Sequence, residues 1–276
     1  MPTFVIVIII VVAVIAALPV LLLLPRRAAM KMKAPFFGLN FAHRGLHDKS
    51  AGIPENSLAA FARAAENGYG MELDVQLSRD GKVVVFHDDT LDRICGVKKR
   101  VDELDYSELS SLSLSGTNER IPLFSEVLKT VDCRTPIIVE LKNGRSNKEL
   151  CEKTLGFLRE YKGLTCIESF NPFIVAWFRF HAPKVFRGQL SQPPECYRRE
   201  GYSRFTAFAL GDLLFNIVAR PHFIAYKIGK KPLLVRFSEA MGAVRIGWTG
   251  RDAEAKYESD FDSVIFEQYM PEPKYK

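Results

Sequence analysis

The hydrophobic pattern divides the chain into two parts. Residues 4–24 are apolar and carry no charged side chain, whereas the remainder alternates short apolar runs with amphipathic stretches. An apolar run of about 20 residues is long enough to cross a bilayer as a helix. Four basic residues follow this run and none precedes it, namely Arg26, Arg27, Lys31 and Lys33. By the positive-inside rule, this asymmetry predicts a single-pass anchor in the cell membrane, with the rest of the chain in the cytoplasm.

We therefore expect a transmembrane anchor at 1–25, a basic juxtamembrane linker at 26–36 and one folded domain at 37–276. The formal net charge is +6, and it falls to +2 when the four basic residues of the linker are left out. The basic character is thus partly juxtamembrane, which suits anionic lipid headgroups. It is not a nucleic-acid footprint, so we expect the bilayer as a partner and no nucleic acid.

Within the folded domain, strand-like and helix-like segments alternate. Strand patterns occur at 37–42, around Glu72 and Asp74, and at 136–142, 164–170, 185–190, 222–227, 244–249 and 263–267. Helix patterns occur at 57–68, 124–131, 148–161, 172–181, 207–218, 232–241 and 252–258. Eight strands alternating with helices predict an α/β fold of the (β/α)₈ type, a TIM barrel. Residues 89–120 are polar and irregular, and we expect them to form a small insertion after the second strand. The apolar helix at 207–218 is expected to lie against either the membrane or the core.

The stretch 71–88 is expected to be a hairpin. The pair at 80–81, Asp-Gly, supplies a two-residue turn, because it tolerates positive φ angles. Such a turn places Asp74 directly opposite His87, and the alternation of side chains along a strand puts Glu72 on the same face as Asp74. The neighbouring residues are apolar, and ionisable groups in apolar surroundings cost free energy unless they bind something. The hairpin therefore marks a candidate site.

Barrel geometry adds residues from distant parts of the chain, because the active sites of TIM barrels form at the carboxyl ends of the strands. Glu140 ends the third strand, so it is expected to join Glu72 and Asp74 at one mouth. Three carboxylates make an all-oxygen site that suits one divalent cation, Ca²⁺ or Mg²⁺. Glu168, in the next strand, is an additional candidate ligand.

Histidines and basic residues lie at the same strand ends. His43 ends the first strand and His87 ends the hairpin, and imidazoles titrate near neutral pH, as a general acid and base require. Arg44 and Lys142 supply positive charge for a phosphate group. A divalent cation, two basic side chains and an acid–base pair together indicate phosphodiester cleavage.

Seven motifs carry a family resemblance. They are AHRG at 42–45, PENSLAAF at 54–61, ELDVQLSRDGKVVVFHDDTLDR at 72–93, IPLFSEVL at 121–128, VELK at 139–142, SFNP at 169–172 and GWT at 247–249. In this order and spacing, the set resembles the glycerophosphodiester phosphodiesterases, in particular the membrane-anchored bacterial type. The resemblance implies a metal-dependent barrel that hydrolyses glycerophosphodiesters to glycerol 3-phosphate and an alcohol. It implies His43 and His87 as the acid–base pair, Glu72, Asp74 and Glu140 as metal ligands, and Arg44 and Lys142 as phosphate contacts.

The chain departs from the family pattern at three places. Ser57 replaces a threonine, Gly250-Arg251 stands where Val-Asn is frequent, and Phe266-Glu267 replaces Thr-Asp at the end of the last strand. The last two departures lie at the rim, where they could change the pocket for the alcohol or the glycerol. Trp248 is expected either to form a wall against the glycerol carbons or to fill the core.

Two alternative functions remain open. The same chemistry could act on lysophospholipids at the membrane surface, as in a lysophospholipase D, or the barrel could be an inactive membrane-tethered scaffold. Outside the site, Glu55 and Asn56 are explained as well by capping and loop bonding, Arg93 and residues 98–100 are expected to be solvated, and His47, His181 and His222 are expected to be structural.

Overall fold

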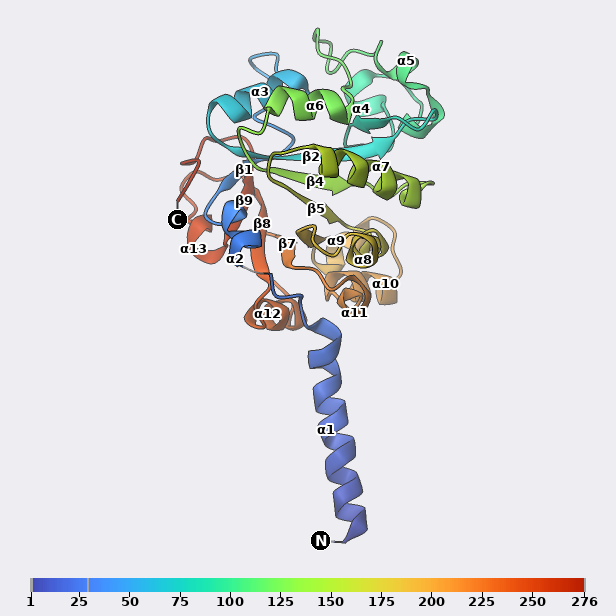
Figure 1. The fold of residues 1–276 in the computed structure, drawn as a ribbon, viewed down its shortest axis with the longest axis vertical. Coiled ribbons are helices and arrows are strands. Elements are labelled where there is room, and N and C mark those ends of the chain that lie inside the picture. Colours follow the sequence, from blue (N-terminus) through green and yellow to red (C-terminus); the bar gives the residue numbers. More distant parts are fainter. Residues whose placement is uncertain (1, 29, 276) are drawn as a thin grey trace.

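Eight parallel strands close into a barrel in the computed structural model, which describes residues 2–28 and 30–275 (Figure 1). The barrel strands are β1 (Asn40–Ala42), β2 (Gly70–Leu77), β4 (Ile137–Leu141), β5 (Thr165–Ser169), β6 (Arg187–Ser191), β7 (Phe223–Lys227), β8 (Val244–Gly250) and β9 (Ser263–Phe266). Strand β1 pairs in parallel with both β9 and β2, so the first and last strands close the sheet. Strand β3 (Val83–Val85) pairs antiparallel with β2 and is not part of the barrel. The predicted TIM-type barrel is confirmed.

Helices cover the barrel and fill its longer connections. In chain order they are α1 (Thr3–Leu23), α2 (Met30–Lys33), α3 (Leu58–Glu66), α4 (Asp92–Cys95), α5 (Tyr106–Leu109), α6 (Phe124–Val131), α7 (Asn147–Glu160), α8 (Pro172–His181), α9 (Pro194–Arg199), α10 (Arg204–Gly211), α11 (Asn216–Ala219), α12 (Leu233–Ala240) and α13 (Tyr257–Asp260). Short 3₁₀ helices occur at η1 (Ala34–Phe36) and η2 (Val101–Glu103). Helices α3 and α8 begin at side-chain caps, because the side chains of Ser57 and Asn171 accept hydrogen bonds from backbone N–H groups of the first turn.

Apolar side chains lie on both faces of the strands. The inner cluster includes Phe41, Ile138, Phe223 and Ile246, and the outer cluster joins the sheet to α3, α6, α7 and α8. Gly188 in β6 allows close packing inside the barrel, since a Cβ atom there would lie 1.9 Å from the Phe223 ring. The interior rows change from apolar to acidic towards the carboxyl ends of β2, β4 and β5, and this change positions the site.

Residues 89–120 form a small lobe beside the barrel mouth. The lobe contains α4, η2 and α5, and its buried apolar side chains pack around a cluster of their own, which includes Leu91, Val101, Leu109 and Ile121. Phe86, at the end of the hairpin, belongs to the same cluster. The lobe is therefore anchored directly beside the strand that carries the acidic residues.

The predicted register of the hairpin is wrong by one residue. Strand pairing sets Val75 opposite Val85, so Asp74 faces Phe86 rather than His87. The loop has three residues instead of two, because Ser78 and Lys82 pair across it and Gly81 adopts a left-handed φ of 73°. His87 lies beyond the end of β3, where the strand pleat no longer fixes the direction of its side chain.

Two predicted helices differ from the observed ones. The helix expected at 207–218 is divided into α10 and α11, because Leu213 has a left-handed φ of 62° that a continuous helix does not allow. The helix expected at 252–258 is reduced to α13, since the Asp252 side chain accepts a hydrogen bond from the Glu254 backbone and favours a turn there. Helix α9 was not predicted.

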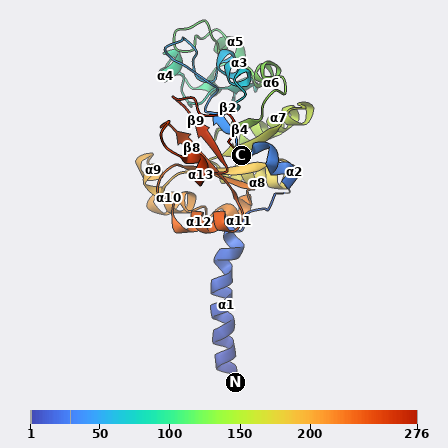
Figure 2. The ribbon, with the colours of Figure 1, turned by 90° about the vertical axis from the view of Figure 1, so that its left-hand side faces the viewer.

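Helix α1 projects away from the barrel (Figures 1 and 2), and its side chains from Phe4 to Ile15 are exposed. The side chains of residue 16 and of residues 18–23 lie outside the described set. Within the part of the chain that the structure describes, no helix is found that is long and apolar enough to cross a membrane. The membrane span predicted at 4–24 is therefore not supported by the structure.

Candidate active site

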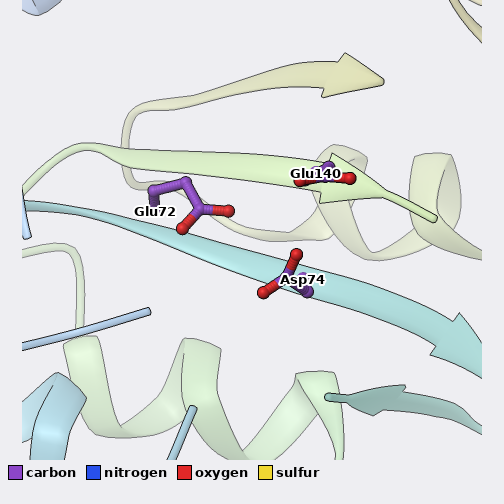
Figure 3. Close-up of side chains that lie close together, drawn as sticks. All are labelled: Glu72, Asp74 and Glu140. Carbon is purple, nitrogen blue, oxygen red and sulfur yellow. The ribbon is translucent and has the colours of Figure 1, made fainter. Parts of the chain in front are cut away.

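Three carboxylates on adjacent strands form the centre of the site (Figure 3). Glu72 and Asp74 both point from β2 into the barrel, because alternate residues of a strand face the same side. Glu140 lies on β4, directly beside Asp74 in the strand register. One carboxylate oxygen from each residue lies within 4.8 Å of the other two, and all three side chains are buried. The structure thus brings the three predicted metal ligands together.

The three carboxylates repel one another in a buried position. Burial, together with the negative charges of Asp74 and Glu140, raises the pKa of Glu72 well above its ordinary value. Burial also raises the pKa of Glu140, against the opposing charge of Lys142. For Asp74, burial opposes ionisation, but the positive charges of His87 and Lys142 outweigh it and hold the pKa below its usual range. A bound divalent cation would relieve this repulsion.

Two further buried groups border the cluster. Glu168 lies on β5 level with Glu140, and its Oε2 atom has no hydrogen-bond partner among the described residues. Burial and the negative charges of Glu140 and Asp74 raise the pKa of Glu168 well above its ordinary value. Glu168 lies outside the group of three clustered carboxylates. Asn56 donates a hydrogen bond of 2.9 Å to Asp74 Oδ2, so this loop residue does reach the site.

Two basic side chains face the carboxylates. Lys142 Nζ lies 2.8 Å from Glu140 Oε1 and 3.4 Å from Asp74 Oδ1. Arg44 contacts two of the carboxylates. Its backbone N–H donates to Glu72 Oε2 at 3.0 Å, and its Nε atom lies 3.6 Å from Asp74 Oδ2. Burial disfavours a charge on Lys142, but the two carboxylates beside it raise its pKa above the ordinary value. Both predicted phosphate contacts therefore carry their charge at the mouth.

His43 is held by a carboxylate that sequence reasoning did not assign to the site. Its Nδ1 atom lies 2.7 Å from Glu267 Oε2, and its Nε2 atom lies 3.9 Å from Glu72 Oε2. Burial opposes ionisation of Glu267, but hydrogen bonds from His43 and His47 and from Arg251 outweigh it and hold the pKa of Glu267 below its usual range. An ionised carboxylate only accepts hydrogen bonds, so the proton of His43 lies on Nδ1 and Nε2 is free.

His87 is held in the same manner by its neighbour in the sequence. Its Nδ1 atom lies 2.6 Å from Asp88 Oδ1, and Asp88 accepts a second hydrogen bond of 2.6 Å from Arg93 Nε. Arg93 also donates to Glu55 at 2.8 Å, and Glu55 accepts from Arg44 at 2.6 Å. Burial opposes ionisation of Glu55, but the two arginines lower its pKa to about 2. Arg93 therefore links His87, through Asp88 and Glu55, to the phosphate contact Arg44. Its side chain is 48% exposed, so it is solvated as expected and forms these ion pairs in addition.

The remaining histidines have other surroundings. His47 lies 3.8 Å from Glu267 at the rim of the mouth, so it has an acidic neighbour that the sequence did not reveal. His181 stacks on Trp177 in α8. His222 is buried and accepts a backbone hydrogen bond of 3.2 Å before β7 begins. Neither of the last two lies at the carboxyl ends of the strands.

Aromatic side chains line another part of the mouth. Trp248 donates a hydrogen bond of 3.2 Å from Nε1 to the backbone oxygen of Ala225, and its ring lies edge-on to Phe170 at 5.6 Å. Phe170 in turn lies edge-on to Tyr197 at 6.3 Å. Phe170 follows β5 and Trp248 lies in β8, and both side chains are partly exposed, whereas Tyr197, which follows β6, is buried. We call these three rings, on the side of the mouth away from the lobe, the aromatic wall.

A polar cavity lies on the opposite side. It has a volume of about 370 Å³ and extends from Lys142 between residues 143–147 and the lobe, where Arg100 and Asp102 line it. The mouth therefore combines an acidic centre, a polar cavity and an aromatic wall.

Comparison with known proteins indicates the family of the chain. Residues 43–265 match the glycerophosphoryl diester phosphodiesterase family. A glycerophosphodiester phosphodiesterase of Caldanaerobacter subterraneus is 31% identical over 244 residues, which cover 82% of this chain and 93% of that protein. A lysophospholipase D of Rattus norvegicus is 33% identical over 154 residues, which cover 51% of this chain and 47% of that protein.

The fold has counterparts among solved structures. The crystal structure of a glycerophosphodiester phosphodiesterase from Thermotoga maritima superposes with a TM-score of 0.62 at 28% sequence identity, covering 83% of this chain and 93% of that one. The family match covers most of the barrel, including every residue of the acidic cluster and both carboxylate-paired histidines. The chain therefore belongs to the glycerophosphoryl diester phosphodiesterase family, and the prediction that it is an enzyme of this family is confirmed.

Proposed function

We propose that the chain hydrolyses glycerophosphodiesters to glycerol 3-phosphate and an alcohol, with Glu72, Asp74 and Glu140 holding one Ca²⁺ or Mg²⁺ ion. The observation that supports this most directly is the meeting of three buried carboxylates with two carboxylate-paired histidines at one end of the barrel. Sequence-distant residues of these types serve no common purpose in folding. Their meeting at the strand ends favours metal-assisted phosphodiester cleavage.

The donor set fits a hard divalent cation. All three side chains offer carboxylate oxygens, which Ca²⁺ and Mg²⁺ prefer over nitrogen or sulfur ligands. Asp74 Oδ1 is buried and accepts no hydrogen bond among the described residues, and Lys142 Nζ lies 3.4 Å from it, which leaves this oxygen able to bind an ion. When bound, the ion would supply Lewis-acid stabilisation of the negative charge that develops on the phosphoryl oxygens.

The two histidines carry the protons. With Nδ1 donating to Glu267 or Asp88, each imidazole keeps Nε2 for the substrate. One histidine takes the proton from the attacking oxygen, and the other delivers a proton to the oxygen of the leaving alcohol. The attacking oxygen belongs either to the glycerol hydroxyl of the substrate or to water. Attack by the glycerol hydroxyl gives a cyclic phosphate, which water then opens.

The remaining residues orient the substrate. Arg44 and Lys142 offer donors and positive charge to the phosphate oxygens. Trp248 and its aromatic neighbours offer an apolar wall to the glycerol carbons, and the cavity beside Lys142 offers polar groups to the alcohol. Water has access to the mouth from the rim, which hydrolysis requires.

Release of glycerol 3-phosphate from glycerophosphocholine by the full-length protein tests the proposal. We expect turnover that excess chelator abolishes and that Ca²⁺ or Mg²⁺ restores. Glu72→Gln is expected to lose turnover, whereas Glu152→Gln, which removes an exposed carboxylate on α7, serves as the matched control and retains it. Undiminished turnover in excess chelator would contradict the metal assignment.

A second candidate substrate is a lysophospholipid, which the chain would cleave in the manner of a lysophospholipase D. The aromatic wall favours this reading, since it offers an apolar surface where an acylated glycerol would lie, and the rat relative bears that name. Turnover of lysophosphatidylcholine and of glycerophosphocholine by the same preparation distinguishes the two. A higher kcat/KM for the lysophospholipid would make it the preferred substrate.

We also propose that α1 places the enzyme at the cell membrane, with the barrel on the cytoplasmic side. The exposed apolar side chains of α1 and the basic residues that follow it support this placement. Protease added to intact cells is then expected to leave the barrel uncut, whereas permeabilised cells should lose it. Digestion in intact cells would reverse the orientation.

A further inference from the structure

Four arginines from separate parts of the chain meet at the amino-terminal end of the barrel strands, opposite the mouth. Arg187 begins β6, Arg179 lies in the last turn of α8, Arg220 follows α11 and Arg26 follows α1. The segment at Arg220 and Pro221 joins them, since Pro221 accepts a backbone hydrogen bond of 2.9 Å from Arg26 and the Arg220 oxygen accepts one of 2.9 Å from Arg187 Nη2. These four residues are the arginine cluster.

Arg187 is buried without a counter-charge. Its side chain is fully shielded from solvent, and its Nε and Nη1 atoms have no hydrogen-bond partner among the described residues. Burial, followed by the positive charges of Arg26 and Arg179, lowers its pKa to about 10. A guanidinium carries five donors, and a buried one is normally paired with a carboxylate or phosphate. Here one backbone oxygen is the partner that the structure shows.

The surroundings of the cluster are positive throughout. Burial, and then the charges of Arg220 and Arg26, lower the pKa of Arg179. Burial, and then the charges of Arg187 and Arg26, lower the pKa of His222 to about 3. The segments 172–181 and 203–222 contain one acidic residue, Asp212, and it is buried elsewhere, among the residues that follow α10. Within the described part of the chain, no carboxylate therefore balances the charges of Arg187 and Arg179.

Apolar side chains surround the exposed edge of the cluster. The Arg179 guanidinium lies over the Phe180 ring at 4.9 Å and donates to the Ile217 backbone oxygen at 3.0 Å. Phe180 is 63% exposed and Ile217 is 43% exposed. Both views show α1 leaving the domain beside α11 and α12, which it contacts (Figures 1 and 2). The Leu24 oxygen at the end of α1 accepts a hydrogen bond of 3.3 Å from Arg220.

We propose that the arginine cluster binds a phosphate group, and that this phosphate is the headgroup of an anionic phospholipid. Arginine forks match phosphate oxygens in geometry as well as in charge. Exposed apolar side chains beside the cluster, and the apolar helix α1 that ends there, would lie against the acyl chains of the same lipid. A free phosphate would contact the arginines in the same way, but it has no acyl chains to lie against the apolar side chains. The site is independent of the catalytic reaction, because it lies at the other end of the barrel.

Binding to the full-length protein in a neutral detergent tests the proposal. Thermal melting is followed while short-chain phosphatidylglycerol, short-chain phosphatidylcholine or inorganic phosphate is added. We expect phosphatidylglycerol to raise the melting temperature and to bind about tenfold more weakly to Arg179→Gln, which loses one charge-assisted contact. Arg159→Gln, which removes an exposed arginine from the last turn of α7, is the matched control and should bind as the original chain does.

The outcomes separate the sources of the phosphate. A stabilisation by phosphatidylglycerol that exceeds the effect of inorganic phosphate supports the lipid, whereas equal effects retain the phosphate site and reject the lipid. Arg187→Met is expected to raise the melting temperature of the ligand-free protein, since it removes an unpaired buried charge, and to abolish the ligand effect. Equal lipid binding by Arg179→Gln, Arg187→Met and Arg159→Gln would overturn the proposal.

Discussion

Removing the charge of Glu72 should make the metal-free protein more stable while it removes the response to metal. Glu72 is 2% exposed, and burial beside two other carboxylates raises its pKa well above the unfolded value. Each pKa unit of that difference costs about 1.4 kcal/mol once the pH exceeds both values. For a domain of this size, about 1 kcal/mol changes the melting temperature by roughly 2–4 °C. Glu72→Gln should therefore melt several degrees higher in chelator at pH 7.

The pH dependence gives the sign of the effect. Between the unfolded pKa of Glu72 and its raised folded pKa, the folded state binds a proton that the unfolded state has released, so stability falls as pH rises. The pKa of Glu140 is also raised, so Glu140 changes stability in the same direction. The pKa of Asp74 is lowered, so the stability that its ionisation contributes is lost only in more acidic solution, below the unfolded pKa. Metal-free protein should thus lose stability between about pH 5 and pH 7.

Differential scanning of the full-length protein in chelator and in Ca²⁺ measures this directly. A ligand at 100 times its Kd stabilises the folded state by about 2.7 kcal/mol, so Ca²⁺ should raise the melting temperature of the original chain and leave Glu72→Gln unchanged. Glu152→Gln is the control for loss of an exposed carboxylate. If Glu72→Gln melts lower than the original chain in chelator at pH 7, the reasoning about the uncompensated cluster is wrong.

Three further predictions concern the acid–base residues. His43→Ala or His87→Ala should lower kcat by roughly 10²–10⁴-fold with little change in metal affinity, and a loss of metal with turnover returning at high Ca²⁺ would make the imidazole a ligand. Glu267→Gln should lower kcat and move the limb of the pH–rate profile that reports His43 to lower pH, because burial lowers the pKa of His43 and the Glu267 carboxylate opposes that shift; an unmoved limb would count against the pairing. Arg93→Met should raise the pKa of Asp88 and lower kcat, because Arg93 fixes the carboxylate that holds His87; a kcat equal to that of the original chain would refute the link.

The composition of the acidic cluster was predictable because it depends on the alternation of side chains along a strand and on barrel topology. Alternation along β2 places Glu72 and Asp74 on one face, and barrel topology brings Glu140 beside them whatever the details of the loops. The hairpin register was not predictable from the Asp80-Gly81 pair, since that pair also suits a three-residue loop with Gly81 left-handed.

Contacts between residues that are far apart in the sequence could not be predicted from it. His43 and Glu267 are 224 positions apart, and they meet because β1 pairs with β9. Arg93 lies in a lobe without regular pattern, so its reach to Asp88 and Glu55 could not be read from spacing. The break at Leu213 had a local signal in Gly211-Asp212, since α10 ends at Gly211, and the apolar run around it outweighed that signal in the prediction.

The attachment of α1 at the amino-terminal end of the strands separates this helix from the mouth. Arg26 and Leu24 bond to the segment before β7, whereas Glu140 and Lys142 lie at the carboxyl end of β4. The height of a barrel strand, about 16 Å for five residues, separates the two ends. The mouth thus faces water on the far side of the domain from the helix. If α1 lies at the membrane, a water-soluble diester can reach the mouth directly, whereas a lysophospholipid has to leave the bilayer first.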